Sequence, residues 1–275
     1  MTTIASLTDT IGAIPITLSP QAEVVAKKRY FLKNDSNEVV EDAPAMFRRV
    51  ADAMASVEKQ YGKLDIDVSL TSNEFYTIMS NLDFVPNSPT LMNAGTKQGT
   101  LSACFVLPLE DSMEGIMKAA HDTAMVQKFG GGTGFALSNL RPKGDRIKTT
   151  HGISCGPIEV LKTLSRVSSM ITQGGKRDGA NMAVMDIHHP DILEFIDCKK
   201  VEGDIHNFNI SVGVTDDFMK AVKAGTNYPL INPRTKEIVE ELDARDVFSK
   251  IVYGAWRNGE PGMIFLDAVN RDNHV

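Results

Sequence analysis

The sequence predicts an α/β protein, with a helical region over residues 1–84 followed by alternating strands and helices over residues 85–275. Apolar residues recur every three or four positions between residues 46 and 57, which is the period of a helix with one apolar face. Every second residue is apolar from 208 to 214, which is the period of a half-buried strand. Strands separated by helices indicate a largely parallel sheet or barrel.

The first 84 residues are expected to form a small helical cap behind a flexible or partly extended arm, residues 1–18. Ser19 and Pro20 offer an N-cap and a proline at the first helical position, so a helix is predicted over residues 21–32. The second predicted helix is the apolar repeat between residues 46 and 57. A third carries the apolar residues between 75 and 82.

The remaining elements follow in order along residues 85–275. Asp111 and Glu114 resemble a capping pair that would start a helix running towards residue 124. Proline starts the predicted helices at residues 157 and 190. The other predictions are strands over 101–107, 182–187, 208–214 and 263–266, and helices over 157–170, 190–196 and 243–256.

Composition limits the class of protein and its partners. With 275 residues and 42% hydrophobic content the chain can bury a substantial core. A formal charge of −6 gives no global basic surface for nucleic acid or an anionic membrane. Three widely spaced cysteines form no disulfide framework and no CxxC zinc pair. No apolar run approaches the roughly 20 residues of a membrane span, and no secretory signal is apparent. We expect a reduced, cytoplasmic protein.

The segment from Asn87 to Thr96 is rich in prolines, hydroxyls and amides, and it runs into Cys104 at the start of an apolar stretch. The prolines, Asn93 and Gly95 predict turns, so polar side chains and free backbone N–H groups would face a ligand beside a thiol. The alternative is a loop that feeds a buried strand, with Cys104 packed as a small hydrophobic residue.

Three glycine-containing loops are candidates for binding a nucleotide. Glycines at 130–134 let backbone N–H groups approach an anion or a sugar, for which a flexible turn is the alternative. The loops 141–148 and 173–179 each combine glycine with two or more cations, for which a solvated surface loop is the alternative. In the nucleotide hypothesis, the cations would hold phosphates and Asp111 would accept a hydrogen bond from a sugar or base.

Histidines and the other two cysteines are not interpreted as a site. His188 and His189 are adjacent, so on a strand they point in different directions, and Pro190 explains the segment as a helix start. Cys155 and Cys198 are interpreted as inert, buried thiols.

Several ordered motifs closely resemble ribonucleotide reductases, particularly the adenosylcobalamin-dependent class II. The similarity covers roughly residues 19–272 and keeps the family's order and spacing. Its motifs lie at residues 28–32, 87–96, 101–104, 111–112, 130–134 and 173–180. The iron-dependent class shares Cys104, Asp111 and the loops, so this half of the sequence leaves the radical generator open.

The resemblance implies a helical region followed by the first half of a ten-stranded α/β barrel. In such enzymes a cysteine thiyl radical abstracts the ribose 3′-hydrogen, while two other cysteines reduce the 2′ position and become a disulfide. Cys104 matches one cysteine of that reducing pair. Ser88, Ala103, Cys104, Gly131 and Gly132 match positions that line the substrate nucleotide.

The resemblance also implies an allosteric site for deoxynucleoside triphosphates and a homodimer. The helices at 112–126 and 157–170 match helices that pack across a dimer interface beside the effector. In the second loop, Gln173 and Arg177 are expected to relay the effector's identity to the active site. The effector-binding positions are Asp111, Arg141, Lys148, Gln173, Lys176 and Arg177.

One departure from the family pattern is expected to matter. The Asn-Pro-Cys-Gly-Glu-type motif that carries the radical cysteine is absent, with the second half of the barrel and most cobalamin contacts. We therefore expect the chain to be inactive alone, and to need a second polypeptide, adenosylcobalamin and a thioredoxin-like reductant. The choice of a di- or triphosphate substrate stays open. The alternatives are a non-catalytic deoxynucleotide-binding module and a non-functional truncation that does not fold.

Overall fold

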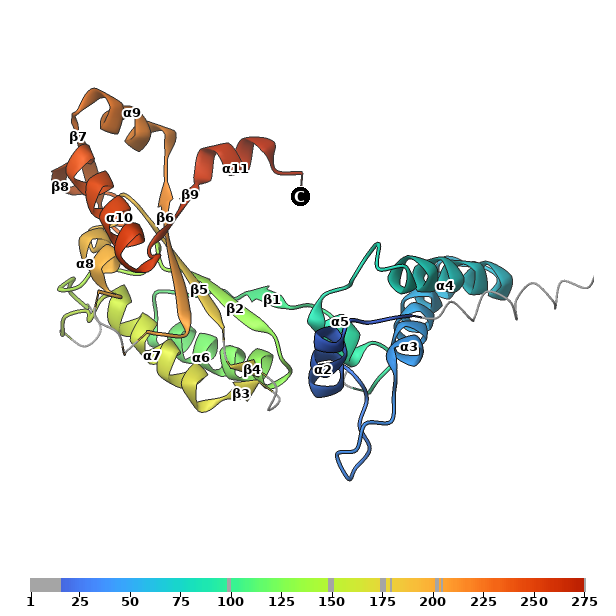
Figure 1. Cartoon of the computed structure of the whole chain (residues 1–275). Coiled ribbons are helices and arrows are strands. Elements are labelled where there is room, and N and C mark those ends of the chain that lie inside the picture. The colour runs from blue at the N-terminus through green and yellow to red at the C-terminus, as the bar shows by residue number, and fades with distance from the viewer. Residues whose placement is uncertain are drawn as a thin grey trace, which may run out of the picture. The chain divides into compact units, whose positions relative to one another are not determined.

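A computed structural model describes residues 16–97, 100–147, 151–173, 177–178, 180–200, 203 and 205–274. The chain forms two compact units, Met1–Ala103 and Cys104–Val275, which we call the helical unit and the sheet unit (Figure 1). Each is described by itself.

The helical unit packs its helices around one apolar core, as the sequence predicts. Its core combines apolar residues of α3 and α4 with Ala26, Phe31, Leu91 and Ala94. Asp42 caps α3 by accepting a hydrogen bond from the Ala45 N–H at 2.9 Å. The elements are α2 (Pro20–Arg29), α3 (Ala43–Ala55), a 3₁₀ helix η1 (Ser56–Tyr61), α4 (Asp65–Ser80) and α5 (Ser88–Asn93).

The proline-rich stretch after residue 84 belongs to the helical unit, so the predicted boundary at 84/85 falls inside this unit. Arg49 joins this stretch to the rest of the helical unit. Its guanidinium pairs with Glu41 at 2.7 Å and donates to the carbonyls of Leu91 and Ala94 at 3.0 and 2.6 Å. Both charged side chains are nearly buried, and a buried ion pair with satisfied hydrogen bonds holds one geometry. Arg49 thereby fixes α5 against α3.

The same stretch was expected to consist of turns, and that prediction is wrong for residues 88–93. These residues form α5, because the Asn87 side chain caps the Thr90 N–H at 3.0 Å and Pro89 lies in the first turn. A proline there has no N–H to lose from the helix and already has a helical φ.

The sheet unit contains a five-stranded parallel sheet in the order β1-β2-β5-β6-β9. This confirms the predicted α/β class, with parallel strands after a helical region. The strands are β1 (Cys104–Val106), β2 (Gly132–Ala136), β5 (Asn181–Asp186), β6 (Phe208–Val214) and β9 (Gly262–Phe265). The helices are α6 (Met113–Lys128), α7 (Pro157–Met170), α8 (Ile192–Asp197), α9 (Asp216–Ala224), α10 (Ala244–Asn258) and α11 (Leu266–Asp272).

One face of this sheet carries the main core. Inward side chains such as Phe135, Met185 and Ile210 pack against apolar residues of α6, α7, α8 and α10, which cover that face in Figure 1. On the opposite face Cys104 and Val106 are exposed. Because parallel strands have all their carboxyl ends at one edge, residues following β2, β5 and β6 meet there.

Two details of the sheet unit differ from the sequence-based predictions. Strand β6 was expected to be half-buried, but six of its seven residues are buried. Leu266 of α11 covers its second face, where a Cβ at Gly213 would lie 2.8 Å from Leu266 Cδ1. The antiparallel hairpin β7 (Asn227–Ile231) and β8 (Ile238–Asp243) was not predicted. A second antiparallel pair, β3 (Thr172–Gln173) and β4 (Arg177–Asp178), lies in the predicted second loop.

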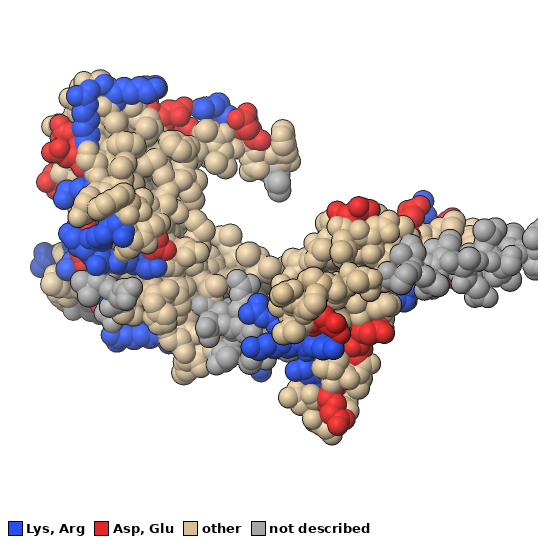
Figure 2. Space-filling model, in the orientation of Figure 1, with Lys and Arg blue, Asp and Glu red and all other residues tan. Residues whose placement is uncertain are grey.

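The surface is not uniformly acidic despite the negative net charge. Figure 2 shows Lys and Arg side chains gathered over α2, whose last turn holds Lys27, Lys28 and Arg29. Among the helices that the structure describes, none is long and apolar enough to cross a membrane.

Candidate functional site

The structure places Cys104 beside the glycine segment. Strand β1 pairs with β2 in parallel register, and Cys104 stands opposite Gly132. Neighbouring strands lie about 4.8 Å apart, so these two predicted substrate-lining residues are direct neighbours. The Cys104 side chain is exposed, and so the packed hydrophobic alternative for this thiol is wrong.

Few side chains project from the sheet face around Cys104, because its neighbours there include Gly132 and Gly134. Residues two apart on a strand share a face, so Cys104 and Val106 lie together. Val106 stands opposite Gly134, which in turn pairs with Met182. A Cβ added at Gly134 would find only backbone oxygens, at 3.9 and 4.0 Å. A flat ligand could approach the backbone here beside the thiol.

Gly131 is closely packed at the end of α6. It is buried, and a Cβ there would lie 2.7 Å from Val126 Cγ1 and 2.8 Å from the Phe105 ring. The N–H groups of Gly130 and Gly131 donate to carbonyls of Gln127 and Val126 at 3.0 and 3.1 Å. These two amides therefore close the end of α6, so the interpretation of them as free donors for an anion is wrong.

Ser88 and Ala103 belong to the helical unit. Ser88 is the first residue of α5, and its hydroxyl lies 3.1 Å from the Tyr30 hydroxyl. This contact orients the Ser88 side chain, and Tyr30 was not singled out from the sequence. Ala103 directly precedes Cys104 in the chain.

Asp111 and Arg141 form a closely bonded pair at the start of α6. Arg141 Nε lies 2.8 and 3.0 Å from the two carboxylate oxygens of Asp111, and the Arg141 backbone N–H donates at 3.1 Å. The helix cap is Ser112, whose hydroxyl accepts from the Gly115 N–H at 3.0 Å. The predicted capping pair of Asp111 and Glu114 is therefore wrong, because Ser112 takes that position and leaves Asp111 to bind Arg141.

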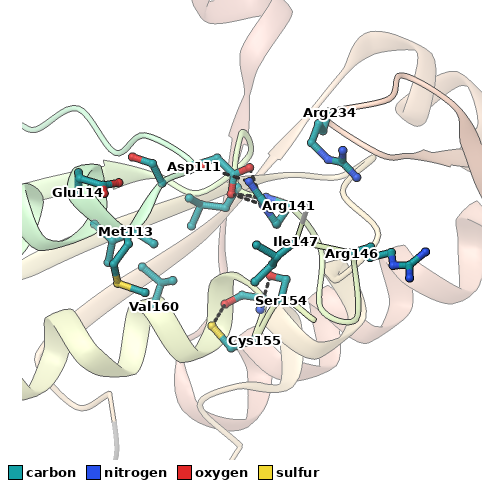
Figure 3. Close-up of a pocket in the computed structure, with 14 residues that line it drawn as sticks. Asp111, Met113, Glu114, Arg141, Arg146, Ile147, Ser154, Cys155, Val160 and Arg234 are labelled. Atoms are coloured by element: carbon teal, nitrogen blue, oxygen red, sulfur yellow. Dashed lines mark hydrogen bonds and ion pairs between the residues drawn. The ribbon is translucent and has the colours of Figure 1, made fainter. Parts of the chain in front are cut away.

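A cavity of about 780 Å³ opens next to this pair. Figure 3 shows Arg141 pointing towards Asp111, with Arg146 and Arg234 lying further along the pocket. Its polar lining comes from the start of α6 and the residues just before it, from the loop between β2 and α7, and from the β7–β8 turn. The lining residues are Asp111, Ser112, Met113, Glu114, Ile116, Leu140, Arg141, Arg146, Ile147, Ser154, Cys155, Gly156, Val160 and Arg234.

Arg234 was missed by sequence reasoning, because its hairpin was not predicted. Its guanidinium binds Asp145 through two nitrogens, with Nη2 at 2.8 Å and Nε at 3.1 Å from Asp145 Oδ2. Burial disfavours the ionised form of Asp145, but hydrogen bonds from Arg234 and the Arg146 N–H outweigh it and lower the Asp145 pKa. The ion pair attaches the hairpin to the loop that lines the pocket.

The remaining predicted effector residues are described in part or not at all. Lys148 and Lys176 lie outside the described residues. Gln173 and Arg177 pair in antiparallel register between β3 and β4, which brings the two ends of the predicted second loop together.

His188 and His189 bind protein groups. His188 Nδ1 donates to the Pro229 carbonyl at 2.8 Å. His189 Nε2 donates to the Leu140 carbonyl at 2.9 Å, and its Nδ1 accepts from the Asp191 N–H at 3.0 Å. Burial lowers the pKa of His189, which favours this neutral form. The described residues contain no group of three His, Cys, Asp or Glu side chains able to hold a metal ion.

The other two cysteines differ from each other. Burial raises the pKa of Cys198 to about 12, as expected for an inert thiol. Cys155 was expected to be buried as well, and this is wrong, because it is exposed and lines the pocket.

Comparison with known proteins agrees with this arrangement. Residues 16–99 match the family model of the ribonucleotide reductase all-alpha domain, and residues 102–275 match that of the ribonucleotide reductase barrel domain. A vitamin B12-dependent ribonucleoside-diphosphate reductase of Thermoplasma acidophilum is 41% identical over 94% of this chain and 41% of its own length. A protein of the same name from Mycobacterium tuberculosis is 41% identical over 94% of this chain and 37% of its own length.

A ribonucleoside-diphosphate reductase subunit alpha of Helicobacter pylori is 30% identical over 89% of this chain and 34% of its own length. The chain thus spans about two fifths of the length of the B12-dependent relatives and about a third of the Helicobacter subunit. The two family models together cover nearly the whole chain, in the order of the helical unit and the sheet unit. The chain therefore belongs to the ribonucleotide reductase family.

Proposed function

We propose that this chain takes part in the reduction of ribonucleotides to deoxyribonucleotides, to which it contributes a redox thiol, part of the substrate floor and an effector pocket. The observation that carries the proposal is the exposed Cys104 thiol in register with Gly132. A ribose that lies on this part of the sheet could contact the Cys104 sulfur, because the residue paired with Cys104 is Gly132, which has no side chain.

The reduction replaces the 2′-hydroxyl of the ribose by hydrogen. Two thiols together supply two protons and two electrons, water leaves, and the thiols join as a disulfide. Cys104 would be one of the two, and an external dithiol such as a thioredoxin-like protein would return it to the thiol by exchange. Cys104 is a free thiol, as the reduced state of this cycle requires.

Adenosylcobalamin is the proposed source of the radical, because the names of the Thermoplasma and Mycobacterium relatives specify vitamin B12 dependence. The described residues form no metal-ligating group of their own. We assign none of them to the cofactor and derive no step through it. In this proposal the contribution of the chain is to hold the nucleotide next to a thiol.

The pocket beside Asp111 is the proposed site for a deoxynucleoside triphosphate. Three guanidinium groups line it, and guanidinium forks suit phosphate oxygens. Arg146 is exposed, and Arg234 is anchored by Asp145 and partly exposed, so both remain accessible to an anion. Asp111, already oriented by Arg141, has acceptor capacity left for a sugar hydroxyl. Lys148, Lys176, Gln173 and Arg177 stay predicted members of this site.

A homodimer is proposed through α6 and α7, because α6 exposes an apolar stripe. Met113, Met117 and Met125 are 67%, 48% and 42% exposed, and residues four apart lie on one helix face. Met113 also lines the pocket, so a second copy covering this stripe would border the effector.

The thiol chemistry is tested by a reduction assay with the chain complemented by a polypeptide carrying the rest of the barrel. Ribonucleoside diphosphate, adenosylcobalamin and dithiothreitol would be supplied. Cys104→Ser should abolish deoxyribonucleotide formation, while Cys198→Ser, the same change at a half-buried thiol, should leave it within about threefold. Full activity of the Cys104 variant would refute the assignment.

The alternative is a regulatory module that binds deoxynucleotides without turnover. It is favoured by one observation, namely that the residues lining the pocket do not include Cys104. Calorimetric binding of dTTP or dATP, lost on Asp111→Ala and combined with no turnover in any complemented mixture, would favour this module over the enzyme.

A further inference from the structure

A buried network of polar side chains lies at the base of the glycine turn and of the β3–β4 hairpin. Its core members come from α6, β2, α7 and β5, and each is at most 4% exposed. They are Gln127, Thr133, Ser168 and Asn181. Most of the other side chains that pack between the sheet and these two helices are apolar.

The network is closely bonded. Gln127 Nε2 donates to Asn181 Oδ1 at 2.7 Å and to Ser168 Oγ at 3.1 Å. The Thr133 hydroxyl donates to the same Asn181 oxygen at 2.5 Å. Asn181 Nδ2 donates to Ser168 Oγ at 2.9 Å and to the Asn207 carbonyl at 3.2 Å. Asn181 therefore joins all the other members.

The four residues of the network lie near the ends of two loops. Gln127 and Thr133 stand two residues before and two residues after the turn at residues 129–131. Ser168 and Asn181 stand before and after the segment that contains β3 and β4. In addition, the Thr133 N–H donates to the Ala180 carbonyl at 3.2 Å. The ends of both loops are thus tied to one another.

Such a network is not the most stable filling for this space. Replacing a buried polar group and its partners by apolar residues of similar shape is often neutral or stabilising. Here one acceptor is also unsatisfied, since the buried Gln127 Oε1 has no hydrogen-bond partner. An unsatisfied buried acceptor costs about 1–3 kcal/mol. A role in positioning accounts for a polar centre at this place better than stability does.

We propose that this network is a positioning device, which transmits a shift of the β3–β4 hairpin to the glycine turn and so to Gly132 and Cys104. The inference rests on the proposed function, in which the hairpin senses a bound deoxynucleotide and the turn lines the substrate. Gln127 is its pivot. Its Nε2 donates to Ser168 and Asn181 on the hairpin side and lies 3.4 Å from the Thr133 hydroxyl on the turn side.

The chain offers a matched pair of substitutions for the test. Thr133→Val removes a hydroxyl of the network and keeps the shape of the side chain. Thr123→Val makes the same change one turn before Gln127 on α6, where the buried hydroxyl bonds only to the Ala119 carbonyl of its own helix, at 2.7 Å. Gln127→Leu is a second network variant, in case Thr133→Val fails to fold.

The readout is hydrogen exchange of the amides in residues 130–136, with and without dTTP, together with calorimetric affinity. In the wild type and in Thr123→Val, saturating dTTP should slow exchange in this segment at least threefold. In Thr133→Val or Gln127→Leu the affinity should stay within threefold while the slowing disappears. Slowing that persists in both network variants would overturn the coupling alone. Failure of the wild type to bind either dTTP or dATP would overturn the effector site, and the coupling with it.

Discussion

The two glycines Gly131 and Gly134 should respond oppositely to the same substitution, because their surroundings differ. A methyl group at Gly131 would lie 2.7 Å from Val126 Cγ1 and 2.8 Å from Phe105 Cε2, closer than real Cβ atoms approach. A methyl group at Gly134 would meet only two backbone oxygens, at 3.9 and 4.0 Å. The first change overpacks the end of α6, and the second places a methyl on the open sheet face.

The size of each effect follows from these contacts. Overpacking costs typically about 1–3 kcal/mol, and since Phe105 and Val126 are only half-buried and can shift, we expect about 1–2 kcal/mol for Gly131→Ala. For a unit of this size that lowers the Tm by about 2–8 °C. Gly134→Ala should be neutral or stabilising by up to about 1 kcal/mol, because alanine loses less backbone entropy in a strand than glycine does.

Thermal unfolding followed by circular dichroism measures both variants against the wild type, with nucleotide binding followed in parallel. If Gly131→Ala kept the wild-type Tm but weakened nucleotide binding, Gly131 would serve ligand approach and the packing explanation would be refuted. Equal destabilisation by both variants would show that chain entropy or strand register, and not the contacts at Gly131, decides the outcome.

Four further outcomes are expected. Arg234→Ala should weaken dTTP binding about tenfold, as loss of one charge-assisted contact implies, whereas Lys220→Ala on α9 should leave calorimetric affinity unchanged. Met117→Glu should shift the chain from dimer to monomer in light scattering, because it puts a charge into the exposed methionine stripe; a dimer that persists would place the interface elsewhere. Iodoacetamide at pH 8 should label Cys198 more slowly than the exposed Cys155, since burial raises the pKa of Cys198 from 9.0 to about 12; equal labelling of the two thiols, measured by mass spectrometry, would contradict this explanation. Burial lowers the pKa of His189 from 6.5, so the neutral form of this side chain stabilises the fold above pH 6.5 and that stabilisation is lost as the pH falls. The free energy of unfolding, measured by denaturant titration between pH 7 and pH 5, should therefore decrease less in His189→Gln than in the wild type.

Periodicity predicted the regular elements well and the exceptions poorly. The four-residue repeat of α3 and the alternation in β6 identified both elements, because apolar spacing reports which face is buried. It could not show that Leu266 closes the second face of β6, since that contact comes from a helix 50 residues later. The hairpin of β7 and β8 was missed because Pro229 in β7 argues against a strand, and because five of the six residues of β8 are exposed.

The candidate site was also predicted only in part from the sequence. The resemblance to the family located Cys104, Gly132 and Asp111, and the strand register shows the first two to be neighbours. Side-chain partners were not accessible from sequence spacing. Arg141 belongs with Asp111 although 30 positions separate them, and Arg234 reaches Asp145 from 89 positions away. These pairings depend on how loops fold over the sheet, which no local pattern encodes.

Strand β1 is only three residues long, and in the described sheet it pairs with β2. So short a strand forms few ladder hydrogen bonds, and its local opening should need less free energy than that of the longer strands β5 and β6. In the proposed cycle the Cys104 sulfur alternates between a free thiol and a bond to a second sulfur, so it must change its position with each turnover. The short strand offers Cys104 that freedom while the longer, buried strands stay rigid.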